Sequence, residues 1–313
     1  MIEITKYNPS MQREWDQLVD LSRNGTFLHR RGYMDYHSDR FVDASLMAHD
    51  NGRLVAVLPA NRTDDTLWSH QGLTHGGWIV PARHMDGTVM MRVMEAAMEH
   101  LRANGVRRLI YKAVPHIYHR YPAEEDIYAL WRYGARLSES NLSSVIDLNC
   151  PLSPDRGNKA GMNRALRAGV ATGYSDDWQG YWNLLESTLQ ERYGAQPVHT
   201  LAEMKLLRDR FPDNILLYTA TLPQQLLAGV VVFLTHTVAR CQYIAASEQG
   251  REVSALALLM DRLRTDATAR GLRWLDFGTS NGDHGQYLHE SLLQQKARLG
   301  GRGIAFNTYQ LDL

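Results

Sequence analysis

The feature that most limits how this chain can fold is an order of elements that occurs twice. Residues 45–62 (SLMAHDNGRLVAVLPANR) predict two strands joined by a tight turn, and residues 215–235 (ILLYTATLPQQLLAGVVVFLT) predict two strands joined by a Leu-Pro-Gln-Gln connection. Asn51-Gly52 is typical of a two-residue hairpin, because both residues accept the positive φ angles of such a turn. In each copy a further strand, an amphipathic helix, a glycine and another strand follow. We therefore predict a duplicated α/β module.

The helix of each copy carries apolar residues at helical spacing, so each should bury one face. These residues are Met90, Met94, Ala97, Met98 and Leu101 in the first copy, and Leu256, Leu259, Met260, Leu263 and Ala267 in the second. Prolines, glycines and polar residues cluster at 151–161 (PLSPDRGNKAG), a composition typical of a connection. We expect an N-terminal domain at 1–152 and a C-terminal domain at 153–313, each a mixed sheet flanked by helices.

Composition limits the classes of partner. Lys plus Arg and Asp plus Glu both total 34, so no net charge attracts a nucleic acid or a membrane surface. We expect no DNA partner and at most peripheral membrane contact. The basic stretch 156–167 is either a solvated helix face or a phosphate-binding surface. The cysteines, Cys150 and Cys241, fit neither a disulfide framework nor zinc-ligand spacing. The amino end lacks the features of a secretion signal and the apolar runs are short, which favours a soluble cytoplasmic protein.

The stretch WLDFGTSNGDH places Ser280 between Gly278 and Gly282, the arrangement of a hydrolase nucleophile elbow. In that fold an acid and then a histidine follow on later strand-end loops. The tail after Ser280 is too short for the two further strand–helix units that those loops need. We therefore interpret Ser280 as a turn or capping residue, and the glycines as permitting tight backbone bends.

His116 and His119 raise the question of a metal site. Pro115 and Pro122 limit any helix that would place both histidines on one face, and no acidic third ligand is suitably spaced. We predict no metal.

The order and spacing of the elements resemble the FemAB-like proteins, which have tandem GNAT-like domains and are related to the aminoacyl and peptidyl transferases that build peptidoglycan cross-bridges. The resemblance covers nearly the whole chain and depends on no short invariant motif. The stretches that carry it include TFLHRRGYMDYHSDRF, WSHQGLTHGGWIV, YKAVPHIYHRYPAEEDIYAL, NKAGMNRALRAGV, YIAAS, DFGTSNG and LLQQKARLGG. It implies an α/β fold made of two tandem GNAT-like domains.

The resemblance also implies site residues. Lys296 in QQKARLGG matches the lysine that faces the reacting groups in these transferases; on sequence alone it would be a surface lysine near a helix end. Arg192 in LESTLQERYG and Tyr243 in CQYIAAS match residues that contact the phosphates of a nucleotide-linked precursor. Their alternatives are a solvated helix residue and a sheet-packing residue. Asp276 and Asp283 would act at the catalytic centre and Asn281 would bind the acceptor amine, unless all three are turn residues.

Polar and aromatic residues of the first domain lie on expected loops, which carry function more often than core strands do. The candidates for lining a substrate channel are Trp68, His70, His75, Lys112, His116, Tyr118 and His119. For each of them taken singly, an ordinary surface or turn role is the alternative.

The function that the resemblance implies is an acyl or aminoacyl transferase. It would act directly, without a covalent intermediate, on an amine of a nucleotide- or lipid-linked sugar or peptide precursor of the cell wall. The donor is acyl-CoA or aminoacyl-tRNA. Neither RHMDGT nor SEQGREVS has the usual glycine spacing of a CoA pyrophosphate turn, and tRNA would need the basic stretch 156–167. The alternatives are a CoA-dependent N-acyltransferase for a sugar or small amine, and a non-catalytic binding scaffold.

Overall fold

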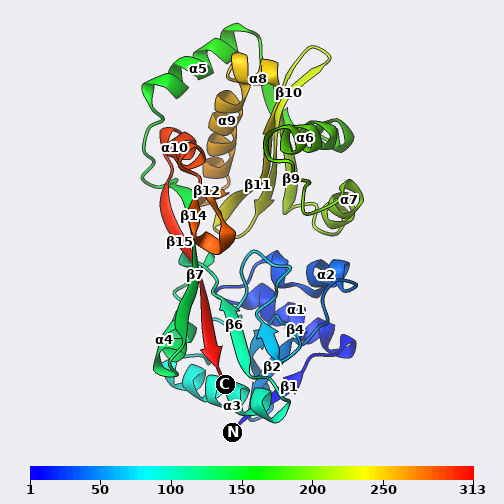
Figure 1. Ribbon diagram of the computed structural model, residues 1–313, viewed down its shortest axis with the longest axis vertical. Helices are drawn as coiled ribbons and strands as arrows, with labels where there is room; N and C mark the ends of the chain where they lie inside the picture. Colours follow the sequence, from blue (N-terminus) through cyan, green and yellow to red (C-terminus); the bar gives the residue numbers. More distant parts are fainter. The chain divides into compact units, whose positions relative to one another are not determined.

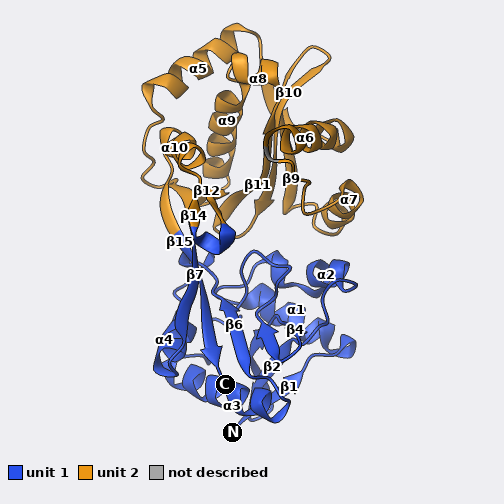
Figure 2. Ribbon diagram, in the orientation of Figure 1, with its two compact units in different colours: residues 1–141, 283–286, 305–313 blue, residues 142–282, 287–304 orange. Residues whose placement is uncertain are grey.

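The chain divides into two compact units, and the predicted domain boundary between residues 152 and 153 stays a prediction. The structure, a computed structural model, describes residues 1–192 and 194–313, and the side chain of residue 193 lies outside the described residues. Unit 1 contains residues 1–141, 283–286 and 305–313, and unit 2 contains residues 142–282 and 287–304 (Figure 2). The chain changes units inside strands β7 (Arg136–Asp147) and β15 (Arg302–Asp312).

Unit 1 contains short strands in two groups. An antiparallel sheet is formed by β1 (Ile2–Lys6), β2 (Leu46–Asp50) and β3 (Arg53–Leu58). The other group is β4 (Asn61–Thr63), β5 (Thr66–Trp68), β6 (Arg108–Lys112) and the end of β15, in which only β5 and β6 are parallel. The hairpin expected at 45–62 is confirmed as β2 and β3, and its turn residues Asn51 and Gly52 have φ angles of 50° and 80°.

The longest helix of unit 1 is α3 (Gly87–Ala103), and its predicted apolar face is confirmed. Asp86 caps its N-terminus by accepting a hydrogen bond from the Val89 N–H at 2.9 Å. All five predicted apolar residues are buried, in one core cluster with residues of β2 and β3. The other helices of unit 1 are α1 (Gln12–Leu21), α2 (Arg31–Met34) and α4 (Glu125–Arg132), with short 3₁₀ turns.

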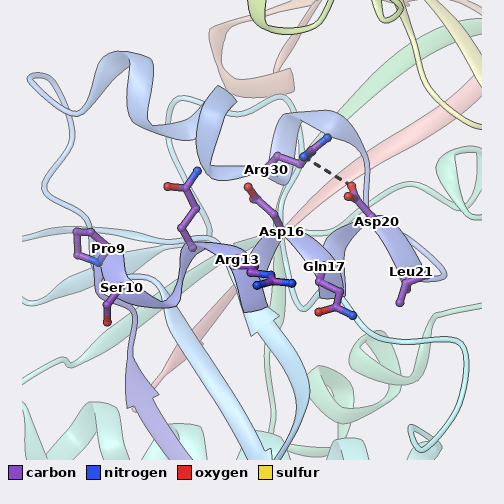
Figure 3. A pocket seen from close by; sticks show the side chains of 9 residues that line it. Pro9, Ser10, Arg13, Asp16, Gln17, Asp20, Leu21 and Arg30 are labelled. Carbon is purple, nitrogen blue, oxygen red and sulfur yellow. Dashed lines mark ion pairs between the residues drawn. The ribbon is translucent and has the colours of Figure 1, made fainter.

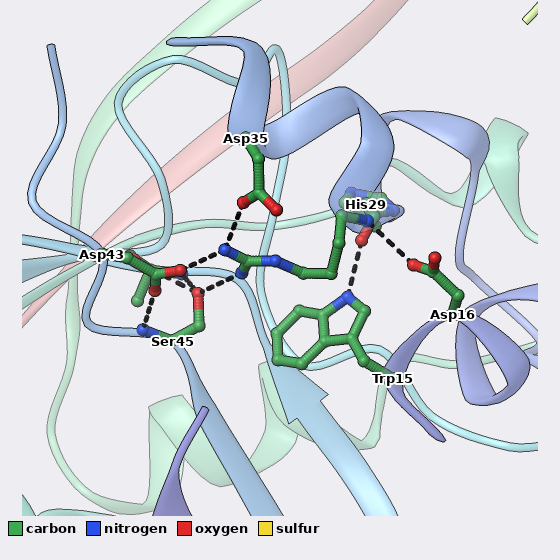
Figure 4. A network of polar contacts seen from close by, with 8 residues as sticks. Trp15, Asp16, His29, Asp35, Asp43 and Ser45 are labelled. Atoms are coloured by element: carbon green, nitrogen blue, oxygen red, sulfur yellow. Dashed lines mark hydrogen bonds and ion pairs between the residues drawn. The ribbon is translucent and has the colours of Figure 1, made fainter. Parts of the chain in front are cut away.

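A buried arginine joins several segments of unit 1. Arg31 is 3% exposed, and its guanidinium contacts the carboxylates of Asp35 and Asp43 and the Ser45 hydroxyl (Figure 4). It also lies 3.9 Å from the centroid of the Tyr7 ring. A buried guanidinium needs such partners because an unpaired charge in the core is strongly destabilising, so we assign this network to the stability of unit 1.

Buried histidines give unit 1 an expected sensitivity to acid. His29 is fully buried, its Nδ1 accepts the Thr26 N–H at 3.0 Å, and its Nε2 lies 3.2 Å from the His75 carbonyl oxygen. Burial lowers the pKa of His29 to about 4, below the ordinary 6.5. The folded chain therefore keeps this ring neutral while the unfolded chain protonates it. The stabilisation is fully present above pH 6.5 and is lost as the pH falls towards 4.

We expect His29→Gln, which keeps hydrogen-bonding groups but does not titrate, to weaken this pH dependence. As the pH falls from 6.5 towards 4, the free energy of unfolding of the wild type should decrease more steeply than that of His29→Gln. The difference between the two slopes should be about 1.4 kcal/mol per pH unit. Urea unfolding followed at several pH values measures it. His116→Gln is the control because His116 is exposed. Equal slopes in the wild type and His29→Gln would contradict the assignment.

Unit 2 contains a larger mixed sheet. Its strand order is β7-β12-β11-β10-β9-β8, and only β11 and β12 are parallel. The strands are β8 (Ala171–Tyr174), β9 (Ile215–Leu222), β10 (Gln225–Leu234), β11 (Val238–Ala246) and β12 (Trp274–Thr279). A separate short pair is β13 (Asn281–Gly282) with β14 (Tyr287–Leu288). The second expected hairpin is confirmed as β9 and β10.

Helices cover both faces of this sheet (Figure 1). Alternate residues of β10 point to opposite faces. Ala228 and Val230 belong to the core cluster that contains α9 (Ala255–Ala269), whereas Gly229 lies against Tyr181 of α6 (Trp178–Tyr193). The remaining helices are α5 (Arg156–Arg167), α7 (Leu201–Arg210), α8 (Glu248–Glu252) and α10 (Glu290–Arg298). The predicted apolar residues of α9 are buried except Leu256, which is partly exposed.

Candidate functional site

The candidate site begins where two parallel strands of unit 2 separate. β11 and β12 pair only between residues 238–240 and 274–276. Beyond this point β11 stays paired with β10 up to Ala246, and β12 stays with β7 across a register shift between Asp276 and Thr279. Gly278 lies in this irregularity with φ 77°, a conformation that favours glycine. Beyond Arg240 and Asp276 the two strands are no longer paired with each other.

A cavity of about 340 Å³ lies in unit 2 at this separation. Its size is within the range of small-molecule sites. Its apolar lining residues include Leu189, Ile244, Ala245, Ala246, Leu256, Ala257, Met260, Phe277, Leu292 and Leu299. Its polar ones are Asn158, Thr188, Arg192, Arg251, Ser254, Gln295 and Lys296. We call this cavity the splay pocket. It combines an apolar floor with cationic groups.

Lys296 is the buried residue of α10, and its whole residue is 6% exposed. Its Nζ donates to the carbonyl oxygens of Gly278 and Thr279, each at 2.8 Å, and to Ser280 Oγ at 3.0 Å. Burial lowers its pKa to about 8, partly opposed by the negative charge of Asp276. The surface position that sequence alone suggested is therefore wrong, because the ammonium is held inside unit 2.

A network of hydrogen bonds around Asp276 fixes the irregular end of β12, which in turn binds Lys296. The Asp276 carboxylate is fully buried and accepts from Arg240 at 2.7 Å, from the Ser143 hydroxyl at 2.5 Å and from the Gly278 N–H at 2.8 Å. The hydrogen bond from the Gly278 N–H fixes the backbone in the irregular part of β12. The carbonyl oxygen of the same residue accepts a hydrogen bond from Lys296. Asp276 thus acts on the lysine through the turn and through its charge.

Ser280 lies between β12 and β13. Its N–H donates to the Leu142 carbonyl at 3.0 Å, its own carbonyl accepts from the His289 N–H at 2.8 Å, and its hydroxyl accepts from Lys296. Because Ser280 is 1% exposed, its hydroxyl holds the lysine rather than facing solvent. Asn281 has a similar local role, since its side-chain oxygen accepts the Leu142 N–H at 2.6 Å. Asp283 is exposed and belongs to unit 1.

The two residues expected to contact phosphates lie in different surroundings. Arg192, near the C-terminus of α6, is exposed and lines the splay pocket with Lys296. The Tyr243 hydroxyl lies 2.6 Å from Nδ1 of His199 and accepts the His199 N–H at 3.2 Å, and its ring packs edge-on against Trp182. The structure thus brings Arg192 and Lys296 together in one pocket and engages the Tyr243 hydroxyl with His199.

The residues of unit 1 that we expected to line a substrate channel contact mainly other groups of the protein. Lys112 Nζ donates to the carbonyls of His70, Gln71 and Leu73 at 3.2–3.5 Å, and burial lowers its pKa. His70 is buried at φ 72°, and burial lowers its pKa to about 3. Tyr118 is 1% exposed, with its ring centroid 4.4 Å from that of His75. A role for these residues in a substrate channel stays a prediction.

Trp68 ends β5 and is partly exposed. Of the two histidines considered for a metal, His119 is held by the Val114 carbonyl at 3.0 Å from its Nε2. In the part of the chain that the structure describes, no group of three or more His, Cys, Asp or Glu residues could hold a metal ion. Nor does any described helix have both the length and the apolar composition needed to span a bilayer.

A wide depression of about 780 Å³ over α1 is less suited to catalysis (Figure 3). Its described lining residues are all exposed or half-exposed. Its ion pair, Arg30 with Asp20 at 3.6 Å, joins side chains that are 41% and 52% exposed. Such charges are hydrated and interact weakly, so the splay pocket is the candidate site.

Sequence reasoning missed the residues that connect β11 to α9. Arg251 and Ser254 line the splay pocket, and Ser254 precedes α9 at φ 60° without a side-chain cap. The segment SEQGREVS carries the signal, because its arginine and serines lie at a strand–helix junction, which a pattern of glycine spacing does not detect. Its Gly250 serves packing, since an added Cβ would lie 2.1 Å from the Leu227 carbonyl oxygen.

Comparisons with known proteins agree with this geometry. Residues 156–287 match the family model of the acetyltransferase (GNAT) domain, a range that contains α5 to β12 and most of the splay pocket. No curated protein matches the chain. The match lies almost entirely in unit 2, so this part of the chain is similar to a GNAT domain.

Solved structures resemble the whole chain at low identity. FemX is 12% identical with a TM-score of 0.72, covering 99% of this chain and 97% of that one. The C-terminal domain of a putative lysylphosphatidylglycerol synthetase from Agrobacterium fabrum is 10% identical with a TM-score of 0.62, covering 96% and 92%. A tandem GNAT protein from the clavulanic acid pathway is 14% identical with a TM-score of 0.53, covering 100% and 98%. These likenesses concern the fold: the chain has the α/β fold of tandem GNAT-like domains that we predicted.

Proposed function

We propose that this protein, whose second unit is similar to an acetyltransferase (GNAT) domain, is an acyl or aminoacyl transferase. It transfers an acyl group from an activated donor in the splay pocket to an amine of a nucleotide- or lipid-linked precursor of the cell envelope. The observation that carries the proposal is the buried ammonium of Lys296 at the wall of an apolar pocket. A preorganised cation in a poorly hydrated site is suited to stabilising an oxyanion.

The chemical step is a direct acyl transfer. The amine nitrogen attacks the donor carbonyl, a C–N bond forms and the carbonyl electron pair moves to oxygen. When the tetrahedral intermediate collapses, the C–S or C–O bond to the carrier breaks and its electron pair leaves with the sulfur or the ribose oxygen. The proton that the nitrogen loses goes to this leaving group. The ammonium of Lys296 lowers the energy of the oxyanion as its negative charge develops.

The present contacts of Lys296 indicate how it would reach an oxyanion. All three of its N–H groups have an acceptor, so one must be released. Two acceptors are backbone carbonyls fixed in the β12 turn, whereas Ser280 Oγ can move away by rotation about χ1. Release of the Ser280 hydroxyl therefore frees one N–H for the substrate.

The donor is bound by groups that favour anions. Arg192 and Arg251 line the splay pocket, and the first turn of α9 contains no acidic residue. Cationic side chains beside a helix N-terminus suit the phosphates of CoA. An aminoacyl-tRNA would instead use the exposed Arg156, Lys159 and Arg167 of α5, since Gly157 and Asn158 of this helix line the pocket.

The neighbours bear on the acceptor. FemX and the lysylphosphatidylglycerol synthetase are similar in fold, and the name of the second enzyme specifies an aminoacylated lipid. That name supports an acceptor linked to a lipid, whereas a nucleotide-linked acceptor rests on the resemblance of the sequence to the FemAB-like proteins. The second candidate function is a CoA-dependent N-acyltransferase for a sugar or small amine, which the match to an acetyltransferase domain favours.

Donor binding tests the proposal. Calorimetry with CoA and filter retention of charged tRNA, each at low and moderate salt, should detect one donor class, with tRNA binding falling steeply as salt rises. Arg251→Gln should weaken CoA binding alone, and Lys159→Gln with Arg167→Gln should weaken tRNA binding alone. If neither donor binds, the protein is a non-catalytic scaffold and the proposal is wrong.

A further inference from the structure

A thin wall of side chains closes one end of the splay pocket. Four residues that line this pocket also line a second cavity of only about 10 Å³: Ala257 and Met260 of α9, Phe277 of β12 and Leu299. The other walls of the small cavity are Ile146, Pro154, Met162, Asp261 and Arg264. A space of that size holds at most about one water molecule. The four shared side chains therefore separate a ligand-sized space from a small void.

We infer that this wall is the end of the acyl-binding part of the splay pocket, and that Met260 sets the length of the acyl group. The inference rests on the proposed function. Met260 is 4% exposed and borders both cavities. Its long unbranched side chain can fill irregular space where two cavities adjoin. Removing the end of that side chain would join the void to the pocket.

The charges of the splay pocket restrict the chemical class of the acyl group. Arg192, Arg251 and Lys296 line it, and no described lining residue is a carboxylate. A cationic acyl group would be buried beside these cations without a counter-ion, at high energetic cost. An uncharged acyl chain would instead bury its methylene groups against the apolar floor. The site accordingly favours an acyl group whose far end is uncharged and apolar over one whose far end is cationic.

A series of small thioesters with increasing acyl length tests whether the wall sets the length of the acyl group. The test does not depend on whether CoA or tRNA carries this group. The probes are S-acyl-N-acetylcysteamines with acetyl, butanoyl, hexanoyl, octanoyl and decanoyl chains, and binding to the full chain is measured by calorimetry. In the wild type we expect affinity to rise about fourfold per added methylene, and then to fall once the chain meets the wall. Met260→Ala removes three heavy atoms and should move the optimum to chains longer by about three atoms.

Two further variants distinguish a change in the preferred acyl length from a general loss of stability. Ala257→Leu fills the pocket side of the same wall and should move the optimum to shorter chains. Met94→Ala makes the same substitution at a buried position of α3 in unit 1, so it should lower stability and leave the chain-length preference unchanged. If neither Met260→Ala nor Ala257→Leu alters the optimum, the wall does not set acyl length and the inference is wrong.

Charge selectivity has its own probe. The hexanoyl thioester carrying a terminal amino group should bind at least about tenfold more weakly than the uncharged heptanoyl thioester of similar length. Equal binding would overturn the charge assignment. Normal binding of CoA or charged tRNA, with thioester binding independent of length, would overturn this inference alone. Absence of binding by thioesters, CoA and charged tRNA together would overturn the proposed function as well.

Discussion

Lys296→Met should lower kcat for acyl transfer by at least about 100-fold, the usual effect of removing an oxyanion-stabilising donor. Methionine keeps the length and apolar stem of lysine but cannot donate to an oxyanion. The measurement is product formation with whichever donor binds, with circular dichroism to verify folding. Lys159→Met on the exposed face of α5 is the matched control and should retain normal kcat when CoA is the donor. Full activity in Lys296→Met would contradict the assignment.

The pH profile separates the possible roles of Lys296. Burial lowers its pKa to about 8, and only the protonated ammonium stabilises an oxyanion. Wild-type kcat should therefore decrease as the pH rises through about 8. A general base would give the opposite slope, because the neutral amine would be the active form. The two slopes can be distinguished in one series of buffers, and an increase of kcat across this range would exclude the oxyanion role.

Asp276→Ala should lower the free energy of unfolding by about 3–5 kcal/mol, the range measured when one partner of a buried ion pair is removed. The substitution leaves the Arg240 guanidinium, whose side chain is 12% exposed, without its carboxylate. It also removes the acceptor of the Ser143 hydroxyl and of the Gly278 N–H. Urea unfolding measures the change. Asp266→Ala, which breaks the surface pair with Arg262, is the control and should change stability little.

Asp276→Asn tests whether this residue also affects the reaction. Asparagine keeps one acceptor for the turn but removes the charge that raises the pKa of Lys296. The fall of kcat with pH should therefore begin at a lower pH than in the wild type. A large loss of kcat at all pH values, with stability preserved, would instead indicate that the carboxylate contacts a substrate.

The helices and hairpins were accessible from sequence because their signals are local. Asn51-Gly52 selects a tight turn by its φ preferences, and the apolar spacing of α3 and α9 selects the buried face of each helix. Both features were predicted without knowledge of any distant contact. The chain passes between its compact units inside β7 and β15, where strand continuity leaves no compositional mark.

The candidate site likewise has features that follow from the sequence and features that depend on distant contacts. Lys296 and Arg192 were identified by resemblance, and they line one pocket. The sequence around Lys296 does not indicate that this residue is buried. Its burial depends on the carbonyl oxygens of Gly278 and Thr279, which lie on β12 and not on the helix of Lys296. Similarly, the contact of Tyr243 with His199 joins residues 44 positions apart. Arg251 was missed because a pattern of glycine spacing does not detect an arginine at a strand–helix junction.

The sequence by itself determined the repeated α/β order and the apolar faces of the central helices, since these follow from the preferences of neighbouring residues. Tertiary structure alone decided that β11 and β12 separate, that the ammonium of Lys296 is buried beside the resulting pocket, and that Met260 lines both this pocket and a small void. These properties arise from the packing of segments far apart in the chain. Burial and charge environment depend on that packing, and they determine what chemistry the residues can perform.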